Sequence, residues 1–318
     1  FYMYSMIISI CFPVFAGLCL LLCREIKNRK ILLTVTGGAL LVSAVLVVMA
    51  LCMSQGGMLT LFNLTDRLPV LFKVDEISVI FSSVTVIVFL CAGFFSFEYM
   101  KHEKKEKRYY GYLLIVFGVL NALCFAGNLI TFYLFFEMLT LTSLPLVLHN
   151  GSREAVMAGL KYLFYSLCGA YMALFGIYFI ERYGNTLTFS PGGVFSAEAA
   201  AAHQEIFLVI AFVMLIGFGV KAGMFPMHAW LPAAHPVAPA PASAVLSAVI
   251  VKAGVLAVVR IVYFIFGASF LRGTWVQTVW MILTLTTVFL GSVLAYREPL
   301  LKKRLAYSTV SQLSYILF

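Results

Sequence analysis

The sequence contains little charge. Only 11% of its 318 residues are Asp, Glu, Lys or Arg, whereas 63% are hydrophobic, and the mean hydropathy is +1.01. A soluble globular domain has about 25% charged and about 45–50% apolar residues. The composition therefore excludes a soluble domain and predicts an all-α, polytopic membrane helix bundle.

Acidic residues are scarcer than basic ones, so the formal net charge is +9. This excess does not indicate a nucleic-acid partner, because most Lys and Arg residues form short clusters between apolar runs and no nucleic-acid-binding motif accompanies them. Charges in such loops are typical topology signals of membrane proteins.

Paired cysteine motifs are also missing. No two cysteines form a CxxC, and all seven lie inside or at the edge of apolar runs, where a thiol is a small membrane-compatible side chain. They are Cys11, Cys19, Cys23, Cys52, Cys91, Cys124 and Cys168. We expect no metal, iron–sulfur, haem or other cofactor site, and the residues leave open whether the chain is part of an enzyme.

What the sequence does have is a series of apolar runs of about 20 residues, each long enough to cross a bilayer. They lie near 2–23, 31–53, 77–97, 109–127, 129–148, 155–180, 206–231, 243–266 and 274–295, and a tenth begins near 304. We therefore expect about nine to ten transmembrane helices. Because the chain starts at Phe1 rather than Met and ends inside the tenth run, we expect it to be a piece of a longer chain.

Two longer loops interrupt the series. Residues 54–76 predict a small hairpin over the membrane surface, and residues 181–205 contain SPGG followed by a short Ala-rich helix. Neither loop is large enough to be a catalytic domain.

Basic residues in the loops are distributed unevenly. Loops after odd-numbered runs hold Arg24, Lys27, Arg29, Lys30, Lys101, Lys104, Lys105, Lys107, Arg108, Arg153, Arg297, Lys302, Lys303 and Arg304, whereas loops after even-numbered runs hold Arg67, Lys73, Arg182 and Arg272. The positive-inside rule then predicts an N-terminus outside the cell and the loops rich in basic residues in the cytoplasm. We expect a multi-pass protein of the cell's inner (plasma) membrane.

Three charges lie near the centres of apolar runs: Glu137, Lys221 and Lys252. Each costs about 2.5–3.5 kcal/mol at mid-membrane on insertion scales, so we infer that they have a function in moving protons or cations. Lys161 and Arg260 lie nearer the ends of their runs, where a long side chain can snorkel to the interface.

Glu137 has polar neighbours on its helix face, because Tyr133, Glu137 and Thr140 are spaced i, i+4, i+7. A carboxylate and an amine in a dry bundle can exchange a proton, since burial and neighbouring charges shift the proton affinity of both. Lysine suits this exchange better than arginine, which stays protonated.

The run at 206–231 is irregular. Gly217, Gly219 and Gly223 surround Lys221, and Pro226 follows, so we expect a helix broken beside a central charge. Transporters use this arrangement at ion sites. His228 and His235 come after the break; their separation does not match a helical metal pair, and a proton relay or a gate suits them better.

Four segments resemble antiporter-like membrane subunits. Residues 128–140 (NLITFYLFFEMLT) resemble the fifth helix of this family, 220–236 (VKAGMFPMHAWLPAAHP) its broken seventh helix, 241–255 (PASAVLSAVIVKAGV) the eighth, and 303–315 (KRLAYSTVSQLSY) a later one. The family comprises the L, M and N subunits of respiratory complex I, subunits of membrane-bound hydrogenases, and Mrp-type cation/proton antiporter subunits.

The resemblance implies roles for five residues. Glu137 and Lys221 would be the acid/base pair of a first half-channel, Lys252 the relay to a second, and Lys161 and His228 accessory positions. Ala233 stands where many members have Asp, which favours a hydrogenase-like or Mrp-like branch.

The resemblance also implies a domain organisation. Family members typically have fourteen helices with two inverted repeats, which gives N-terminal helices at 1–108, a first five-helix repeat at 109–273 and the truncated start of a second at 274–318.

These patterns favour a proton- or Na⁺/H⁺-translocating subunit of a larger membrane complex, with other membrane subunits and the lipid bilayer as partners. Two alternatives stay open: a non-pumping anchor for a peripheral oxidoreductase, and a self-contained transporter of an organic solute, for which nothing in the sequence marks a pocket. The residues do not distinguish H⁺ from Na⁺.

Overall fold

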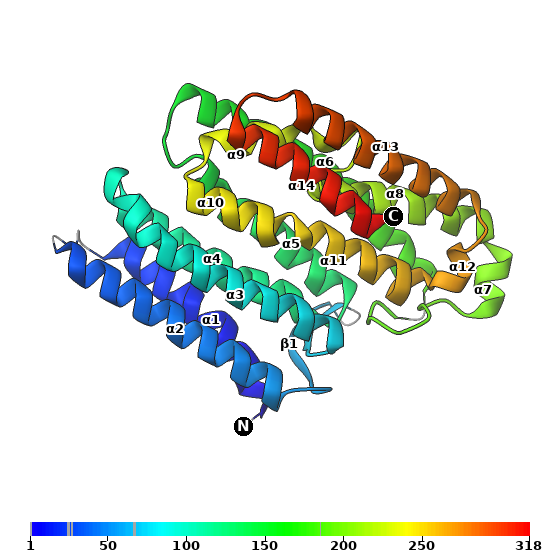
Figure 1. Ribbon diagram of the computed structural model, residues 1–318. Helices are drawn as coiled ribbons and strands as arrows, with labels where there is room; N and C mark the ends of the chain where they lie inside the picture. Colours follow the sequence, from blue (N-terminus) through cyan, green and yellow to red (C-terminus); the bar gives the residue numbers. More distant parts are fainter. Residues whose placement is uncertain (1, 24–25, 27, 66–67, 185) are drawn as a thin grey trace. The chain divides into compact units, whose positions relative to one another are not determined.

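The computed structural model describes residues 2–23, 26, 28–65, 68–184 and 186–318, and it is almost entirely helical (Figure 1). Eight helical segments among these residues are long and apolar enough to cross a membrane. They are α1 (Tyr2–Leu22), α2 (Arg29–Met53), α3 (Glu76–Tyr99), α5 (Leu129–Val147), α6 (Arg153–Tyr183), α8 (Gln204–Lys221), the segment Ala240–Phe266, and α13 (Trp275–Arg297). The expected polytopic all-α fold is thus confirmed.

The other two expected spans are also helices, although they are outside that set of eight. α4 (Glu106–Cys124) begins with a charged turn, and α14 (Leu301–Leu317) has 17 residues. Short elements complete the chain: η1 (Met100–His102), α7 (Ala197–Ala202), η2 (Met227–Trp230), α9 (Leu231–Val237), α10 (Ala240–Val245), η3 (Leu246–Ile250), α11 (Lys252–Arg260), η4 (Ile261–Phe266) and α12 (Ala268–Leu271). α7 is the expected Ala-rich helix, and Ser196 caps its first turn.

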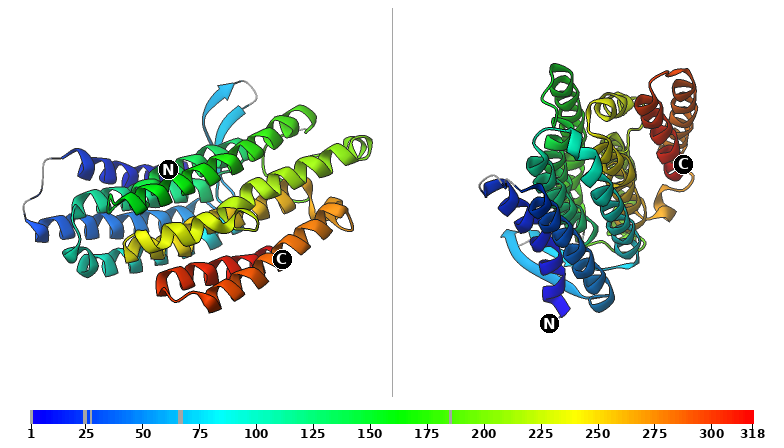
Figure 2. Two further views of the ribbon diagram at one scale, coloured as in Figure 1. Left: turned by 90° about the horizontal axis from the view of Figure 1, so that it is seen from above. Right: turned by 60° about the vertical axis from the view of Figure 1, so that its left-hand side comes forward.

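The helices form two compact units. Unit 1 comprises Phe1–Gly127, Leu134–Gly159 and Val237–Ile250, and unit 2 comprises Asn128–Tyr133, Leu160–Pro236 and Val251–Phe318. α5 and α6 each begin in one unit and end in the other. In unit 2, α13 and α14 lie side by side as a helical hairpin (Figure 2).

The core of unit 1 is α4. Nearly every residue from Tyr109 to Cys124 is buried, as expected for a helix that is apolar on all sides, and α1 and α3 pack against it. Glycine allows α1 to approach closely: a Cβ atom on Gly118 would lie 2.7 Å from the carbonyl oxygen of Ile10, and one on Gly17 would lie 2.5 Å from that of Gly111. Small residues commonly mediate such helix contacts in membranes.

The expected hairpin is confirmed as the antiparallel pair β1 (Met58–Thr65) and β2 (Leu68–Lys73). Two backbone hydrogen bonds hold β2 to the segment after α4, from Lys73 to Phe125 (2.7 Å) and from Gly127 to Leu71 (2.9 Å).

Among the basic residues from which the membrane topology was predicted, Arg24, Lys27 and Arg67 lie outside the described residues.

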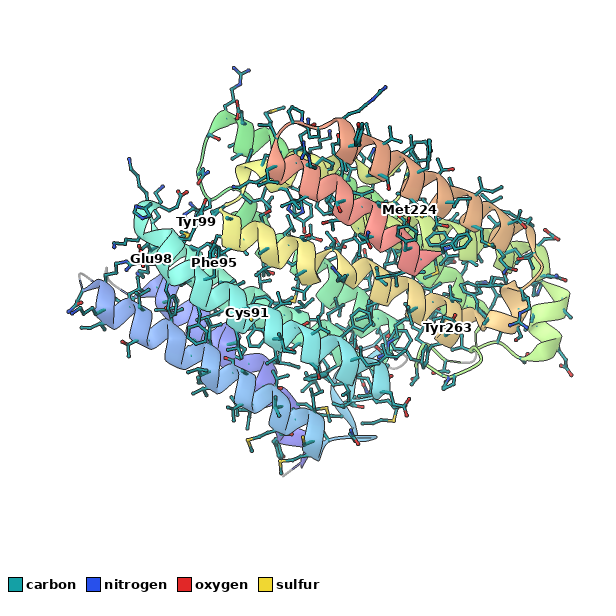
Figure 3. The ribbon with its side chains drawn as sticks, viewed as in Figure 1. Cys91, Phe95, Glu98, Tyr99, Met224 and Tyr263 are labelled. Atoms are coloured by element: carbon teal, nitrogen blue, oxygen red, sulfur yellow. The ribbon has the colours of Figure 1, made fainter. Side chains whose placement is uncertain are left out.

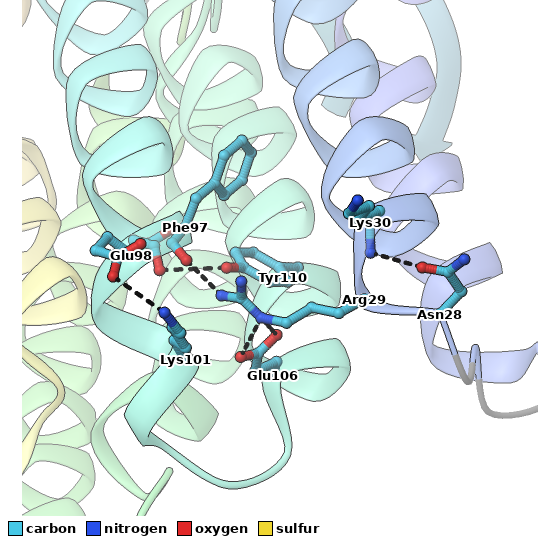
Figure 4. Close-up of polar contacts among 9 residues, drawn as sticks. Asn28, Arg29, Lys30, Phe97, Glu98, Lys101, Glu106 and Tyr110 are labelled. Carbon is cyan, nitrogen blue, oxygen red and sulfur yellow. Dashed lines mark hydrogen bonds and ion pairs between the residues drawn. The ribbon is translucent and has the colours of Figure 1, made fainter.

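An ion pair joins the charged ends of three helices in unit 1 (Figure 4). Arg29 Nε lies 2.9 and 3.0 Å from the two carboxylate oxygens of Glu106, and the same guanidinium donates to the backbone carbonyl of Phe97 at the end of α3. Glu98 and Tyr99 follow on α3 (Figure 3), and Glu98 makes a looser pair with Lys101 at 3.7 Å. The arrangement fixes α2, α3 and α4 at one end of the unit.

The contact between α1 and α4 predicts that Gly118→Ala destabilises the protein. The added methyl group would force the helices apart, which typically costs about 1–3 kcal/mol. Thermal unfolding in detergent measures the effect. Gly38→Ala on α2 is the matched control, because its Cβ atom meets nothing within 4 Å. Equal loss of stability in both variants would contradict the close approach.

The ion pair predicts that Glu106→Gln lowers the free energy of unfolding by about 1–2 kcal/mol, because charge-assisted hydrogen bonds are lost at a site that is partly exposed. Glu98→Gln is the control and should change stability by less than about 0.5 kcal/mol, since its side chain is 79% exposed. The two variants should be compared by chemical denaturation, and the prediction is wrong if Glu98→Gln is the more damaging.

Candidate functional site

The expected break in the seventh span is confirmed in unit 2. α8 ends at Lys221, and Gly223 follows with φ +74°, a conformation that glycine adopts without strain. The chain then turns through Met224 (Figure 3) and continues as η2 and α9. The last residue of a membrane helix is thus a lysine.

The backbone groups freed by the break have partners. The indole N–H of Trp230 donates to the carbonyl of Val220 (2.9 Å), and the amide of Phe225 donates to Thr287 Oγ1 on α13 (3.0 Å). Met224 donates to the carbonyl of Gly219 (3.1 Å). A break inside a membrane protein requires such compensation, because an unsatisfied backbone group away from water costs several kcal/mol.

Close packing on both sides fixes the end of α8. A Cβ atom on Gly217 would lie 2.6 Å from the carbonyl oxygen of Gly169 on α6, and one on Gly254 of α11 would lie 2.6 Å from the amide nitrogen of Ala222. Ala222 directly follows Lys221, and Gly254 comes two residues after Lys252. The structure therefore brings together the chain segments that carry these two lysines, and Lys221 itself is only 1% exposed.

Lys161 and His228 also lie near each other in unit 2. The charge of Lys161 acts on the His228 ring, and the adjacent residues Tyr162 and Trp230 have ring centroids 4.8 Å apart. The buried Nδ1 of His228 makes no hydrogen bond to any residue that the structure describes. Four of the five predicted site residues thus belong to the same unit.

Glu137 is the fifth, and it belongs to unit 1. It lies half-buried in the middle of α5, and Thr140 one turn later is fully buried. Tyr133 begins the same polar face but belongs to unit 2. The pairing of Glu137 with Lys221 stays a prediction.

Whether Arg260 snorkels, which the sequence left open, is answered by its burial. Arg260 does not snorkel: it is 1% exposed, and its guanidinium carbon lies 4.9 Å from the ring centroid of Phe189 and 5.0 Å from that of Phe264. The two aromatic faces enclose the cation inside unit 2. Phe264 lies four residues after Arg260, so the sequence could have suggested this contact. Phe189 is distant in sequence, so only the structure shows the second contact.

His235 lies beyond the expected span, on α9, and is 3% exposed. Burial, together with the positive charge of Lys302, lowers the pKa of its imidazole to about 4. A neutral ring at physiological pH is therefore expected at this position. Among the described residues, no three His, Cys, Asp or Glu side chains form a group that could hold a metal ion.

Comparison with known proteins identifies two matching family models. Residues 126–318 match the family described as "NADH:quinone oxidoreductase/Mrp antiporter, TM". Residues 63–110 match "NADH-Ubiquinone oxidoreductase (complex I), chain 5 N-terminus". The first match includes every predicted site residue.

Curated relatives are similar over about three quarters of the chain. Hydrogenase-4 component B of Escherichia coli (strain K12) is 30% identical over 251 residues, which are 77% of this chain and 36% of that protein. A Na(+)/H(+) antiporter subunit of Bacillus subtilis (strain 168) is 26% identical over 253 residues, 78% of this chain and 50% of that protein. The chain thus spans half or less of the length of these two relatives.

Solved structures share the fold. A chain of the Mrp complex from Dietzia sp. DQ12-45-1b has a TM-score of 0.81 at 23% identity, over 98% of this chain and 58% of that one. A chain of respiratory complex I from Thermus thermophilus has a TM-score of 0.74 at 17% identity, over 98% and 62%.

The lowered pKa of His235 predicts that stability falls as the pH drops. Above about pH 6.5 the ring is neutral in both states; between 6.5 and about 4 only the unfolded state takes up the proton, so stability is lost, by about 3 kcal/mol in total.

The measurement is the melting temperature in detergent between pH 4 and 8. His235→Gln should flatten this part of the profile, whereas His102→Gln, an exposed control, should leave it unchanged. An identical acid slope in His235→Gln would show that another group is responsible.

Proposed function

The chain belongs to the NADH:quinone oxidoreductase/Mrp antiporter transmembrane family, and from this premise we propose that it is a proton- or Na⁺/H⁺-translocating membrane subunit of a multisubunit complex. The observation that carries the proposal is a buried lysine at the broken end of α8, in a segment packed against the one that carries a second lysine. Placing a charge there is costly, and a structural role would be served by an apolar residue.

Lys221 and Lys252 suit a relay because an amine can gain and lose a proton within an apolar interior, where its charge state responds to nearby charges. The segments that carry the two lysines are in contact through Gly254 of α11 and Ala222 at the end of α8. Glu137 would supply the acidic partner of Lys221, and Lys161 and His228 would contribute at the other side of the break.

The break itself supports this role. A helix that ends at Lys221 presents its last carbonyl groups near the lysine, and the glycines around it let neighbouring backbones approach closely. Discontinuous helices form ion sites in transporters, where the ends of their backbones help to bind the ion. The partners would be other membrane subunits. The protein would lie in the plasma membrane with its N-terminus outside. Residues 109–273 and 274–318 would belong to successive repeats.

The proposal predicts that Glu137→Gln and Lys221→Ala each reduce proton translocation by at least about tenfold while the complex still assembles, because each removes a group that must change charge. Proton uptake by inverted vesicles, driven by the complex, measures this, with assembly followed by native gel electrophoresis. Glu154→Gln and Lys104→Ala are matched controls, since both residues are exposed.

Normal uptake by Glu137→Gln and Lys221→Ala would instead favour a non-pumping anchor for a peripheral oxidoreductase. Repeating the measurement without Na⁺ distinguishes the two ions: uptake that persists in Na⁺-free buffer identifies H⁺ as the translocated ion.

A further inference from the structure

Two buried polar atoms in the core of unit 1 have no hydrogen-bond partner among the residues that the structure describes. They are the hydroxyl oxygen of Ser82 on α3 and the side-chain amide oxygen of Asn121 on α4, and both residues are 0% exposed. Buried polar groups in proteins are almost always hydrogen-bonded, either to the protein or to ordered water. Two exceptions on neighbouring helices therefore require a physical explanation.

α3 and α4 are antiparallel neighbours, and two contacts define how they face each other (Figure 1). Near the start of α3, the hydroxyl of Ser78 is hydrogen-bonded to the backbone carbonyl of Cys124 at the end of α4 (2.7 Å). Farther along α3, the ring of Phe89 packs against that of Phe117, with centroids 4.8 Å apart. The helix faces between these two contacts form the interface of α3 and α4.

Ser82 and Asn121 lie on these two faces at nearly the same depth. On α3, Ser82 comes one turn after Ser78, and on α4, Asn121 comes one turn before Cys124. Residues one turn apart share a helix face. At about 1.5 Å per residue, Ser82 lies about 6 Å and Asn121 about 4.5 Å along its helix axis from the bond between Ser78 and Cys124. The two polar side chains therefore face the same part of the interface.

The Asn121 side chain has a defined orientation. Its amide nitrogen donates to the backbone carbonyl of Phe117 (2.9 Å), and a carbonyl can only accept, so the amide oxygen is the atom that still needs a donor. The backbone N–H groups around it are used within α4. Ser82 does not supply the donor directly, since the two side chains are not hydrogen-bonded to each other. A small group that donates to Asn121 and also bonds to Ser82 would satisfy both.

We propose that a water molecule binds between α3 and α4 and joins Ser82 to Asn121. The water donates one proton to the amide oxygen of Asn121 and bonds to the hydroxyl of Ser82, which can both donate and accept. Buried waters typically make about three hydrogen bonds to groups that otherwise have no partner. Two neutral oxygens do not offset the charge of a metal ion, so the ligand is water rather than a cation.

The water gives α3 a polar attachment to the central helix of unit 1. α1 reaches α4 through glycine contacts, whereas α3 presents Ser82 to it. The rings of Phe89 and Phe117 follow along the interface and bound the site with apolar packing. The inference does not depend on the proposed function, because none of these residues belongs to the proposed proton path.

A cryo-electron-microscopy map of the assembled complex, at a resolution that shows ordered water, tests the proposal. We expect a density peak about 2.6–3.2 Å from both Ser82 Oγ and Asn121 Oδ1. The peak should disappear in Asn121→Leu, which keeps a similar size but removes the acceptor. It should remain in Thr85→Val, the matched control on the next turn of α3, because the Thr85 hydroxyl already bonds to the carbonyl of Phe81 on its own helix (2.8 Å).

A map without density between the two side chains would overturn the proposal, whether the Ser82 hydroxyl then bonds to its own helix or directly to Asn121.

Thermal unfolding of the same variants in detergent gives an independent measurement. Ser82→Ala and Asn121→Leu should each lower the melting temperature by about 2–4 °C, because each leaves a buried polar group without its partner. The double variant should lose clearly less than the sum, since it removes both groups that hold the water. Asn121→Leu combined with Thr85→Val should instead give additive losses. Additive losses in Ser82→Ala with Asn121→Leu would show that nothing links the two side chains and would contradict the bridge.

Discussion

The backbone of a membrane helix can be interrupted only where the freed polar groups find partners, because no water is available in the hydrocarbon to replace them. In this protein the interruption after Lys221 meets that requirement through side chains from elsewhere in unit 2: Trp230 binds the carbonyl of Val220, and Thr287 accepts from the amide of Phe225. Once these bonds are made, the position of Lys221 is determined by the backbone of the helix end.

Glycine contacts make the rest of that arrangement possible. Apolar side chains gain little by leaving lipid for the protein interior, so close backbone approach and hydrogen bonding contribute more to helix association than they do in water. Gly217 against Gly169, and Gly254 against Ala222, hold α8 between two neighbours, just as Gly17 and Gly118 hold α1 against α4 in unit 1. Close backbone contact at glycine stabilises each of the two units. In unit 2 it also brings the two segments that carry Lys221 and Lys252 into contact.

The buried cations of unit 2 divide by chemistry. Lys221 and Lys252 carry amines whose charge can change, whereas Arg260 carries a charge that cannot. Cation–π contacts with Phe189 and Phe264 contribute to holding this permanent charge in the interior of unit 2.

Local sequence patterns determined the fold class, the position of the hairpin and the break at Lys221. Each depends on residues close together in the chain: run length and hydropathy for the helices, and Gly217, Gly219, Gly223 and Pro226 for the break. α4 was also predicted as a helix from its apolar residues, and its central position in unit 1 came only from the structure.

Tertiary structure alone decided which partners close the break and where Arg260 points. Trp230 is ten residues from the carbonyl it binds, Thr287 is 62 residues from Phe225, and Phe189 is far in sequence from Arg260. Hydropathy measures how well a segment suits lipid, so it places a charged residue at a depth without saying which residues surround it. Arg260 could have reached the interface by its position in the run, and packing between distant segments instead placed it against two aromatic rings.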